Sequence, residues 1–290
     1  MGPLLREGGW LSVMKKKENT RSWVVALLIA IIGILFLLPL FWMFFSSFKS
    51  TTEVFATNFK WLPAIWHWEN YKYVWSDATV NMTKAYLNTL FITVIATAVQ
   101  LAFASLAAYA FAKINFKGKN FVFFLFLSTM MIPVEVTIIP RFMLFNTIGL
   151  YNNLWAVILP HWFNATAVFM LRQFYMGLPN DLMEAAKIDG AGHLKIFSRI
   201  MMPLTKSALI SLMVLSFVSC WNEYLSPLIF LVKTDLYTVS QSIRWYMLDD
   251  LQRYELVMAA ATSTIIPIII LFIICQKYFV EGIATSGTKG

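Results

Sequence analysis

Charged residues are scarce in this sequence of 290 residues: they make up 13%, whereas soluble domains carry roughly 25%. Hydrophobic residues make up 59%, and the mean hydropathy is +0.67. A soluble fold of this size would lack the charged side chains that cover a surface in water. These values exclude soluble enzymes, disordered tails and disulfide scaffolds, and they predict an integral membrane protein.

The residues of metal, redox and nucleotide chemistry are equally few. Cys220 and Cys275 both lie in apolar runs, where cysteine acts as a small hydrophobic residue. His67, His161 and His193 are scattered without the spacing of a metal site. No Gly-x-x-x-x-Gly-Lys-Ser/Thr run exists, so the chain lacks that way of holding ATP phosphates. We expect no enzyme, no metal and no cofactor in this chain.

Long apolar runs are abundant. A helix needs roughly 20 apolar residues to cross a hydrocarbon core of about 30 Å. Six runs approach or exceed that length, and we expect them to form an all-α domain of six transmembrane helices over residues 23–279. They lie at residues 23–45, 87–112, 121–139, 154–171, 208–232 and 256–279. We expect kinks at the prolines in or beside these runs, which are Pro39, Pro133, Pro160 and Pro227.

The basic residues give the orientation. Alternating the loops places 15 of the 23 Lys and Arg residues on the side of the N-terminus, and the short opposite connection 146–153 has none. Such loops face the cytoplasm, so the segment 1–22 and the tail 280–290 should both be cytoplasmic. The net charge of +8 is explained in this way, and no nucleic-acid partner is expected.

One inner loop, at about residues 176–206, has a helix signature of its own. Asp181 with Glu184 three residues later predicts a capping box at the start of a short helix. Gly190 is suited to its C-terminal turn. A short helix with an acidic start and small residues in its middle can be held closely by another surface.

The same loop carries a family resemblance. The run Glu184–Gly190 (Glu-Ala-Ala-Lys-Ile-Asp-Gly), followed by Ile200 and Pro203, resembles the EAA loop of binding-protein-dependent ABC importer permeases. Met202 stands where those permeases have Leu, which keeps the volume. Further runs look like carbohydrate importer permeases of the MalG type. They are 131–140, 149–160, 221–228 and 279–290.

The resemblance implies a type I ABC importer permease in a bacterial inner membrane. It implies a MalF-like second permease, two ATPase subunits that bind ATP and Mg, an extracytoplasmic solute-binding protein and an oligosaccharide substrate. The residues it places against an ATPase subunit are Asp181, Glu184, Ala185, Ala186, Asp189, Gly190 and Pro203. The outer loop 233–255 would reach the binding protein, with Tyr237, Arg244, Trp245 and Tyr246 as contact candidates, and the tail would contact the ATPase pair.

Polar residues in or beside the spans are candidates for the translocation path, although helix packing and capping are alternative roles for them. The candidates are Glu135, Arg141, Asn146, Asn152, Asn153, Asn164, Gln173, Asn222 and Glu223. Arg141 stands where the family usually has an apolar residue. A guanidinium recognises carboxylates, so an acidic sugar such as an alginate oligosaccharide is one possible substrate.

Two alternatives remain open from the sequence. A proton-coupled secondary sugar transporter would use Glu135 or Glu223 as its proton site. The aromatic residues of the outer segments 46–86 and 233–255 are either interfacial belt residues or part of a docking surface for the extracytoplasmic partner.

Overall fold

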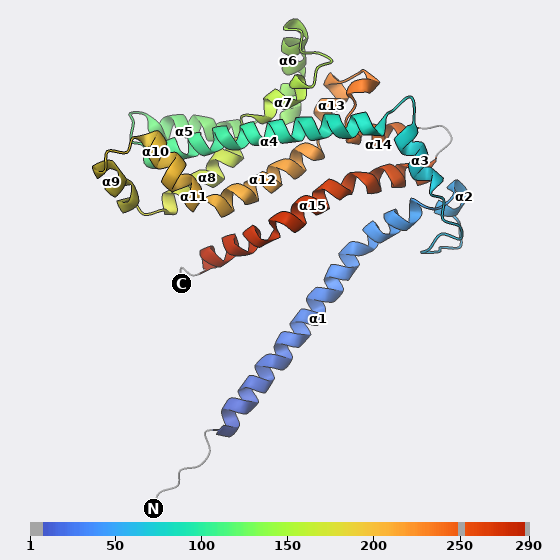
Figure 1. The fold of residues 1–290 in the computed structure, drawn as a ribbon, viewed down its shortest axis with the longest axis horizontal. Coiled ribbons are helices and arrows are strands. Elements are labelled where there is room, and N and C mark those ends of the chain that lie inside the picture. Colours follow the sequence, from blue (N-terminus) through green and yellow to red (C-terminus); the bar gives the residue numbers. More distant parts are fainter. Residues whose placement is uncertain (1–7, 249–252, 288–290) are drawn as a thin grey trace, which may run out of the picture.

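The described part of the chain is built of helices. In a computed structural model that describes residues 8–248 and 253–287, with side chains for 23–248 and 253–278, no strand occurs among these residues. Two long helices, α4 (Met82–Lys113) and α15 (Tyr254–Gly287), run along the long axis of the bundle (Figure 1). The all-α prediction is confirmed.

The central helix α4 contacts most of the others. Asn81 begins it, because its side-chain oxygen accepts the Lys84 N–H at 2.9 Å. Small residues such as Ala104 and Ala108 are buried and let α8 (Ala165–Gly177) approach closely. The helices α7 (Trp155–His161) and α12 (Lys206–Trp221) pack on other parts of α4.

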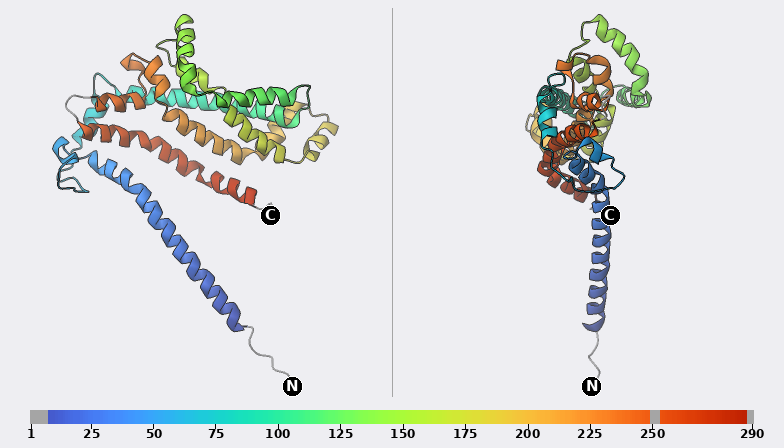
Figure 2. Two further views of the ribbon diagram at one scale, coloured as in Figure 1. Left: turned by 180° about the vertical axis from the view of Figure 1, so that it is seen from behind. Right: turned by 90° about the vertical axis from the view of Figure 1, so that its right-hand side faces the viewer.

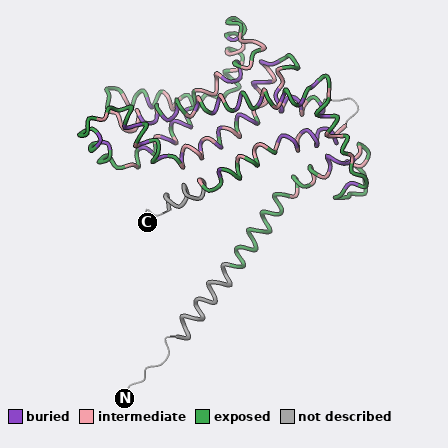
Figure 3. The backbone as a smooth tube through the Cα atoms, viewed as in Figure 1, coloured by how far each residue is buried: buried purple, intermediate pink, exposed green. Residues whose placement is uncertain are grey.

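The first helix, α1 (Gly8–Ser46), contacts α15 near the C-terminal end of α1, and the rest of α1 extends away from the bundle (Figures 1 and 2). None of the residues in its most apolar window is buried, as the exposed stretch in Figure 3 shows. An apolar helix of this length is stable only in lipid or against another chain.

Within the described residues, three helices are long and apolar enough to cross a membrane: residues Trp23–Ser46 of α1, α4 and residues Tyr254–Tyr278 of α15. Two bent helix pairs are also long and apolar enough when the members of each pair are taken together. If each pair is one broken span, the described residues hold up to five spans. The predicted span 154–171 is divided into α7 and α8 by residues 162–164.

The first bend, of 96°, separates α5 (Lys119–Ser128) with η1 (Thr129–Met131) from α6 (Val134–Thr147). Pro133 directly precedes α6, which therefore points away from the bundle (Figure 2). The second bend, of 79°, lies after α11 (Met202–Leu204). By contrast, α1 continues through Pro39.

Side chains also satisfy a backbone group that is freed by a proline inside a continuous helix, α15. Pro267 lies inside α15 and has no N–H, so the Ser263 carbonyl four residues earlier loses its helical donor. The hydroxyl of Tyr86 in α4 donates to that carbonyl. The indole N–H of Trp221 in α12 donates to the next carbonyl, of Thr264, at 3.1 Å. Side chains of two neighbouring helices thus stabilise α15 beside its proline.

The two ends of the bundle differ. One end carries α9 (Asp181–Ile188), α10 (His193–Ile196) and the π-helical turn η2 (Phe197–Met201); we call it the α9 end. The other carries α2 (Thr51–Val54), α3 (Glu69–Ser76), α13 (Leu225–Phe230), η3 (Thr234–Leu236) and α14 (Val239–Met247); we call it the α14 end.

The terminal segments continue the outermost long helices. Residues 8–22 are part of α1 and residues 280–287 are part of α15, while residues 1–7 and 288–290 lie outside the described part. Both helices run toward the α9 end at their termini (Figure 1).

The hydroxyl of Tyr86 should matter because Pro267 is present. Tyr86→Phe leaves the freed carbonyl unpaired, and we expect it to lower the free energy of unfolding by about 1–3 kcal/mol. In a Pro267→Ala background the alanine N–H restores the helical bond, so the cost should fall below about 0.5 kcal/mol. Thermal denaturation of the four purified proteins in one detergent measures this coupling. Equal costs in both backgrounds would contradict it.

Candidate functional site

The predicted short helix is present as α9 and begins at Asp181, as expected. The predicted capping box is wrong. Asn180 precedes the helix with helical angles, φ −74° and ψ −25°, and makes no side-chain cap. Asp181 therefore occupies the first turn itself, where both it and Glu184 favour the positive end of the helix dipole.

Lys113, the last residue of α4, explains why Asn180 does not cap α9. Its ammonium donates to the side-chain oxygen of Asn180 and to the backbone carbonyl of Leu178, each at 2.7 Å. The side chain of Asn180 is therefore engaged by a helix 67 residues away in sequence. This pair of hydrogen bonds ties the start of α9 to the central helix.

The end of α9 is fixed by its own backbone. Gly190 has φ +77°, a conformation that favours glycine, which agrees with the predicted C-terminal turn. Its N–H donates to the Lys187 carbonyl at 3.0 Å, and the Ala191 N–H donates to the Ala186 carbonyl at 2.9 Å. These two bonds form a Schellman motif that ends the helix after about two turns.

One face of α9 is anchored in the bundle. Met183 and Ala186 are buried in a cluster with Ile196 and Phe197 of the following turns and with Tyr109 of α4. The side chain of His193 adds a hydrogen bond to the Tyr109 hydroxyl at 3.1 Å. A displacement of α9 must therefore move the helices packed around this cluster.

The opposite face is exposed and carries both acidic and apolar groups. Asp181, Glu184, Ala185 and Asp189 are exposed. Beside them Ile188 is 86% exposed, and Leu194 in α10 is 76% exposed. Large apolar side chains at the tip of a tightly held connection indicate a contact surface for another protein. Pro203 lies farther along, exposed in α11 just before the 79° bend.

The asparagine candidates mostly bind backbone groups at helix ends. The side-chain oxygen of Asn164 accepts the Ala167 N–H at 3.0 Å and caps α8. Asn153 accepts the Trp155 N–H at 3.1 Å, and Asn222 donates to the Val218 carbonyl at 3.0 Å. Asn146 is exposed near the end of α6, and Gln173 is exposed on α8.

The charged candidates fall into two groups. Glu135 is exposed in the first turn of α6. Glu223 accepts the Ser226 N–H at 2.9 Å and so supports the start of α13. Arg141 in α6 reaches the Ser226 hydroxyl at 3.5 Å, and its guanidinium lies 5.4 Å from the ring centroid of Phe230. Arg141 and Glu223 are thus linked through Ser226, whereas Glu135 lies on α6 six residues before Arg141 and has no part in this link.

Arg141 also borders an open groove. The groove is lined by Arg141 together with Pro140, Leu144, Phe145, Leu159 and Pro160. The Nε atom of Arg141 is buried without a hydrogen-bond partner. A guanidinium at the edge of an apolar groove can bind an anionic or hydroxyl-rich ligand through its terminal N–H groups.

The candidates at the α14 end differ in accessibility. Trp245 is 42% exposed, whereas Tyr246 is 2% exposed. The Tyr246 hydroxyl lies 3.3 Å from the Asp77 carboxylate, and burial raises the pKa of Tyr246. The expectation that Tyr246 contacts a binding protein is therefore wrong for this arrangement. Tyr237 and Arg244 are half-buried, and Arg244 donates to the Tyr224 hydroxyl.

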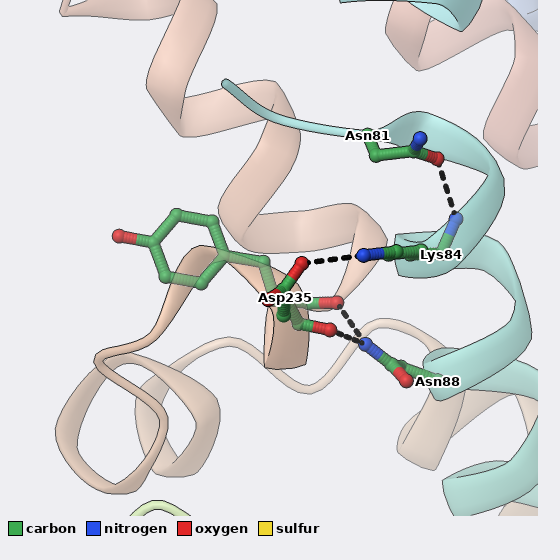
Figure 4. Close-up of polar contacts among 5 residues, drawn as sticks. Asn81, Lys84, Asn88 and Asp235 are labelled. Atoms are coloured by element: carbon green, nitrogen blue, oxygen red, sulfur yellow. Dashed lines mark hydrogen bonds and ion pairs between the residues drawn. The ribbon is translucent and has the colours of Figure 1, made fainter. Parts of the chain in front are cut away.

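A polar cluster positions the segment before α14 (Figure 4). Lys84 pairs with the Asp235 carboxylate at 2.6 Å, and Asn88 donates to the backbone carbonyls of Asp235 and Tyr237 at 2.9 and 3.1 Å. The hydrogen bond from Lys84, with its positive charge, lowers the pKa of Asp235. The cluster joins the first turns of α4 to η3.

Asn152 has a role that its polarity alone did not reveal. It has φ +57°, and its side-chain oxygen accepts the N–H groups of Val232 and Lys233 at 2.7 and 3.2 Å. Its own N–H donates to the Phe230 carbonyl at 2.9 Å. It thereby joins the α6–α7 turn to the segment that leads to α14. The available signal was weak, because asparagine is merely tolerated at positive φ.

Within the described part of the chain, no three His, Cys, Asp or Glu side chains come together as metal ligands would. The features of these residues that can contact a partner or a ligand are the exposed face of α9, the groove beside Arg141 and the exposed α14 end.

Comparisons with known proteins agree on one family. Residues 100–285 match the family described as binding-protein-dependent transport system inner membrane component. The arabinooligosaccharides transport system permease protein AraQ of Halalkalibacterium halodurans is 34% identical over 280 residues, covering 96% of this chain and 100% of that protein. The sn-glycerol-3-phosphate transport system permease protein UgpE of Yersinia pestis is 32% identical over 277 residues, covering 93% and 99%.

A solved structure agrees in fold. A chain from the crystal structure of a bacterial ABC transporter involved in the import of the acidic polysaccharide alginate matches with a TM-score of 0.77 and 25% identity. The match covers 96% of this chain and 100% of that chain. The comparisons give no support to a proton-coupled secondary transporter.

Gly190 should be needed for its backbone conformation. Neither Gly190 nor Gly192 has an atom within 4 Å of the position a Cβ would take, but only Gly190 has positive φ. Gly190→Ala should destabilise the end of α9 by about 1–2 kcal/mol, and hydrogen exchange of the Ala191 amide should be about 5–30 times faster. Gly192→Ala is the matched control. Similar exchange in both variants would contradict the role of this turn.

Proposed function

The chain belongs to the family of binding-protein-dependent transport system inner membrane components, and from this we propose that it is the permease subunit of an ATP-driven importer for oligosaccharides. It moves the solute by alternating access and carries out no covalent chemistry. ATP and Mg are bound by two partner ATPase subunits. A second, MalF-like permease and an extracytoplasmic solute-binding protein complete the transporter.

The contact surface on α9 supports the coupling step of this proposal. Glu184 and Asp181 present carboxylates that can pair with basic groups of an ATPase subunit. Ile188 supplies an exposed apolar anchor for the same contact. Because Met183, Ala186 and the Lys113 hydrogen bonds hold the other face, movement of the ATPase subunit would be transmitted to α4, α8 and α12.

The same geometry supports an orientation for this transporter. The α9 end must face the cytoplasm, where the ATPase subunits bind ATP. The N-terminal end of α1 and the C-terminal end of α15 lie on that side along the long axis of the bundle (Figure 1), and so do the basic loops of the sequence. The α14 end then faces the binding protein, with Trp245 as its exposed aromatic candidate and Tyr237 and Arg244 as half-buried neighbours.

An acidic oligosaccharide is the substrate class that the groove beside Arg141 supports. Ser226 and the ring of Phe230 hold the guanidinium at the edge of that groove, and its Nε remains unpartnered. The structural match to an alginate transporter chain agrees with this assignment, while the arabinooligosaccharide permease represents a neutral alternative. Asn146, Asn153, Asn164, Asn222, Glu135 and Glu223 remain candidates for the path on polarity alone.

Charge reversal of Glu184 should uncouple the transporter. In vesicles containing the complete complex, Glu184→Lys should lower uptake per ATP hydrolysed about tenfold or more, since a charge-assisted hydrogen bond contributes about 1.5–3 kcal/mol. Glu69→Lys reverses an exposed acid at the α14 end and serves as the control. Full coupling in Glu184→Lys, or uptake by this subunit alone, would refute the proposal.

Replacement of Arg141 should change selectivity. Arg141→Leu should reduce uptake of uronate oligosaccharides about tenfold or more relative to neutral oligosaccharides, because the charged donors are lost. Arg141→Lys keeps the positive charge and should lose less of the uptake of uronate oligosaccharides. The measurement is uptake of both sugar types by the complete complex with its binding protein. Equal losses for both sugars, or a wild-type complex that imports only neutral ones, would contradict the acidic substrate.

A further inference from the structure

A polar pocket at the α9 end lies outside the regions described so far. It has a volume of about 460 Å³ and is formed by the α4–α5 connection and one side of α8. Its polar lining includes Asn115, Lys119, Asn120 and Arg172. The end of α4, the start of α5 and α8 lie side by side here (Figure 1).

The charge of this pocket is positive. Arg172 donates through Nε to the Phe111 carbonyl at 3.3 Å, and its guanidinium carbon lies 4.2 Å from the ring centroid of Phe123. Lys119 donates to the Ala112 carbonyl at 3.3 Å. Among the ion pairs of the described residues, neither cation has an acidic partner.

The backbone adds to the same potential. Gly118 has φ +80° and directly precedes α5, a helix of 10 residues. The first N–H groups of a helix have no intrahelical partner, and the helix dipole makes that end positive. With two cations and two amide side chains beside it, this helix start adds to the positive potential of the pocket.

Exposed apolar side chains surround the pocket and indicate which kind of anion would fit there. Phe121 and Phe116, which line the pocket, are 66% and 43% exposed. Phe124 and Leu125 extend this exposed apolar surface along α5, within a helix pair that passes the test for a membrane span. An anion bound here would have hydrocarbon directly beside it, which suits a phospholipid and not a soluble ion.

We propose that this pocket binds the phosphate of an anionic phospholipid headgroup in the leaflet at the α9 end, with the acyl chains along α5. Arg172 and Lys119 contact the phosphate, and the amides of Asn115 and Asn120 bind the rest of the headgroup. The bound lipid holds the α4–α5 connection against α8. Lys113, which fixes the start of α9, lies at the end of α4 next to this connection. The lipid site depends on the proposed function only for which leaflet it faces.

The test uses the complete transporter reconstituted in nanodiscs of phosphatidylglycerol and phosphatidylcholine and then released from them. Native mass spectrometry counts the lipids that remain bound. We expect one phosphatidylglycerol to be retained preferentially, and Lys119→Gln to weaken its retention about fivefold, since each cation near an anionic surface contributes about 1 kcal/mol. Lys117 lies two residues before Lys119, and its side chain does not line the pocket. Lys117→Gln removes the same charge and should leave lipid retention unchanged.

Three outcomes would overturn the proposal. The first is equal phosphatidylglycerol retention in Lys119→Gln and wild type. The second is an equal loss in the Lys117 and Lys119 variants, which would indicate surface charge alone. The third is displacement of the lipid by millimolar inorganic phosphate, which would indicate a soluble anion. Lipid retention is measured without ATP or sugar, so its failure is distinguishable from failure of the coupling proposal.

Discussion

The structure depends on one constraint: in an apolar bundle every free backbone N–H and carbonyl needs a partner from within the protein. Several helices here are interrupted and others contain a proline, and each such site frees backbone groups. The Ser263 carbonyl freed by Pro267 is satisfied by Tyr86 from α4. The start of α8 is satisfied by Asn164. Broken helices can occur in this protein because neighbouring side chains are placed to complete them.

The helix α4, which is itself unbroken, contributes to that support through Tyr86 and also anchors the packing of the bundle. Met82, Ala85, Ile92 and Ala104 of α4 belong to four separate clusters of buried residues, distributed from its first turn to its second half. The broken helices α7, α8 and α12 pack against this one continuous element. A rigid central helix with segmented neighbours permits the neighbours to shift relative to it, which is what alternating access requires.

The α9 segment is connected to α4 in two ways. Its buried face shares a cluster with Tyr109, and its start is held by Lys113. A short helix that ended in flexible loops could move without moving the membrane helices. Here the Schellman turn at Gly190 and the Lys113 hydrogen bonds remove that freedom, so a force applied to the exposed face reaches the bundle.

Local signals in the sequence were sufficient for elements whose causes are local. Two acidic residues and a glycine predicted α9 and its exit turn, because both features act within a few residues. The capping box failed because its competitor, Lys113, lies far away in sequence and binds Asn180. The expected surface position of Tyr246 likewise failed because of contacts with residues distant in sequence. Its burial depends on contacts with α3 and α15, which no local pattern records.

The uncovered helices α1 and α6 pose different physical problems. The apolar part of α1 spans 24 residues, so lipid alone can surround it. The helix α6 has 14 residues, about 21 Å of length, and begins after a sharp bend at Pro133. The free N–H groups of its first turn cannot face hydrocarbon. That end of α6, with Glu135 beside it, must therefore meet protein or water. The two uncovered helices therefore differ: lipid can surround α1, whereas the start of α6 needs polar surroundings.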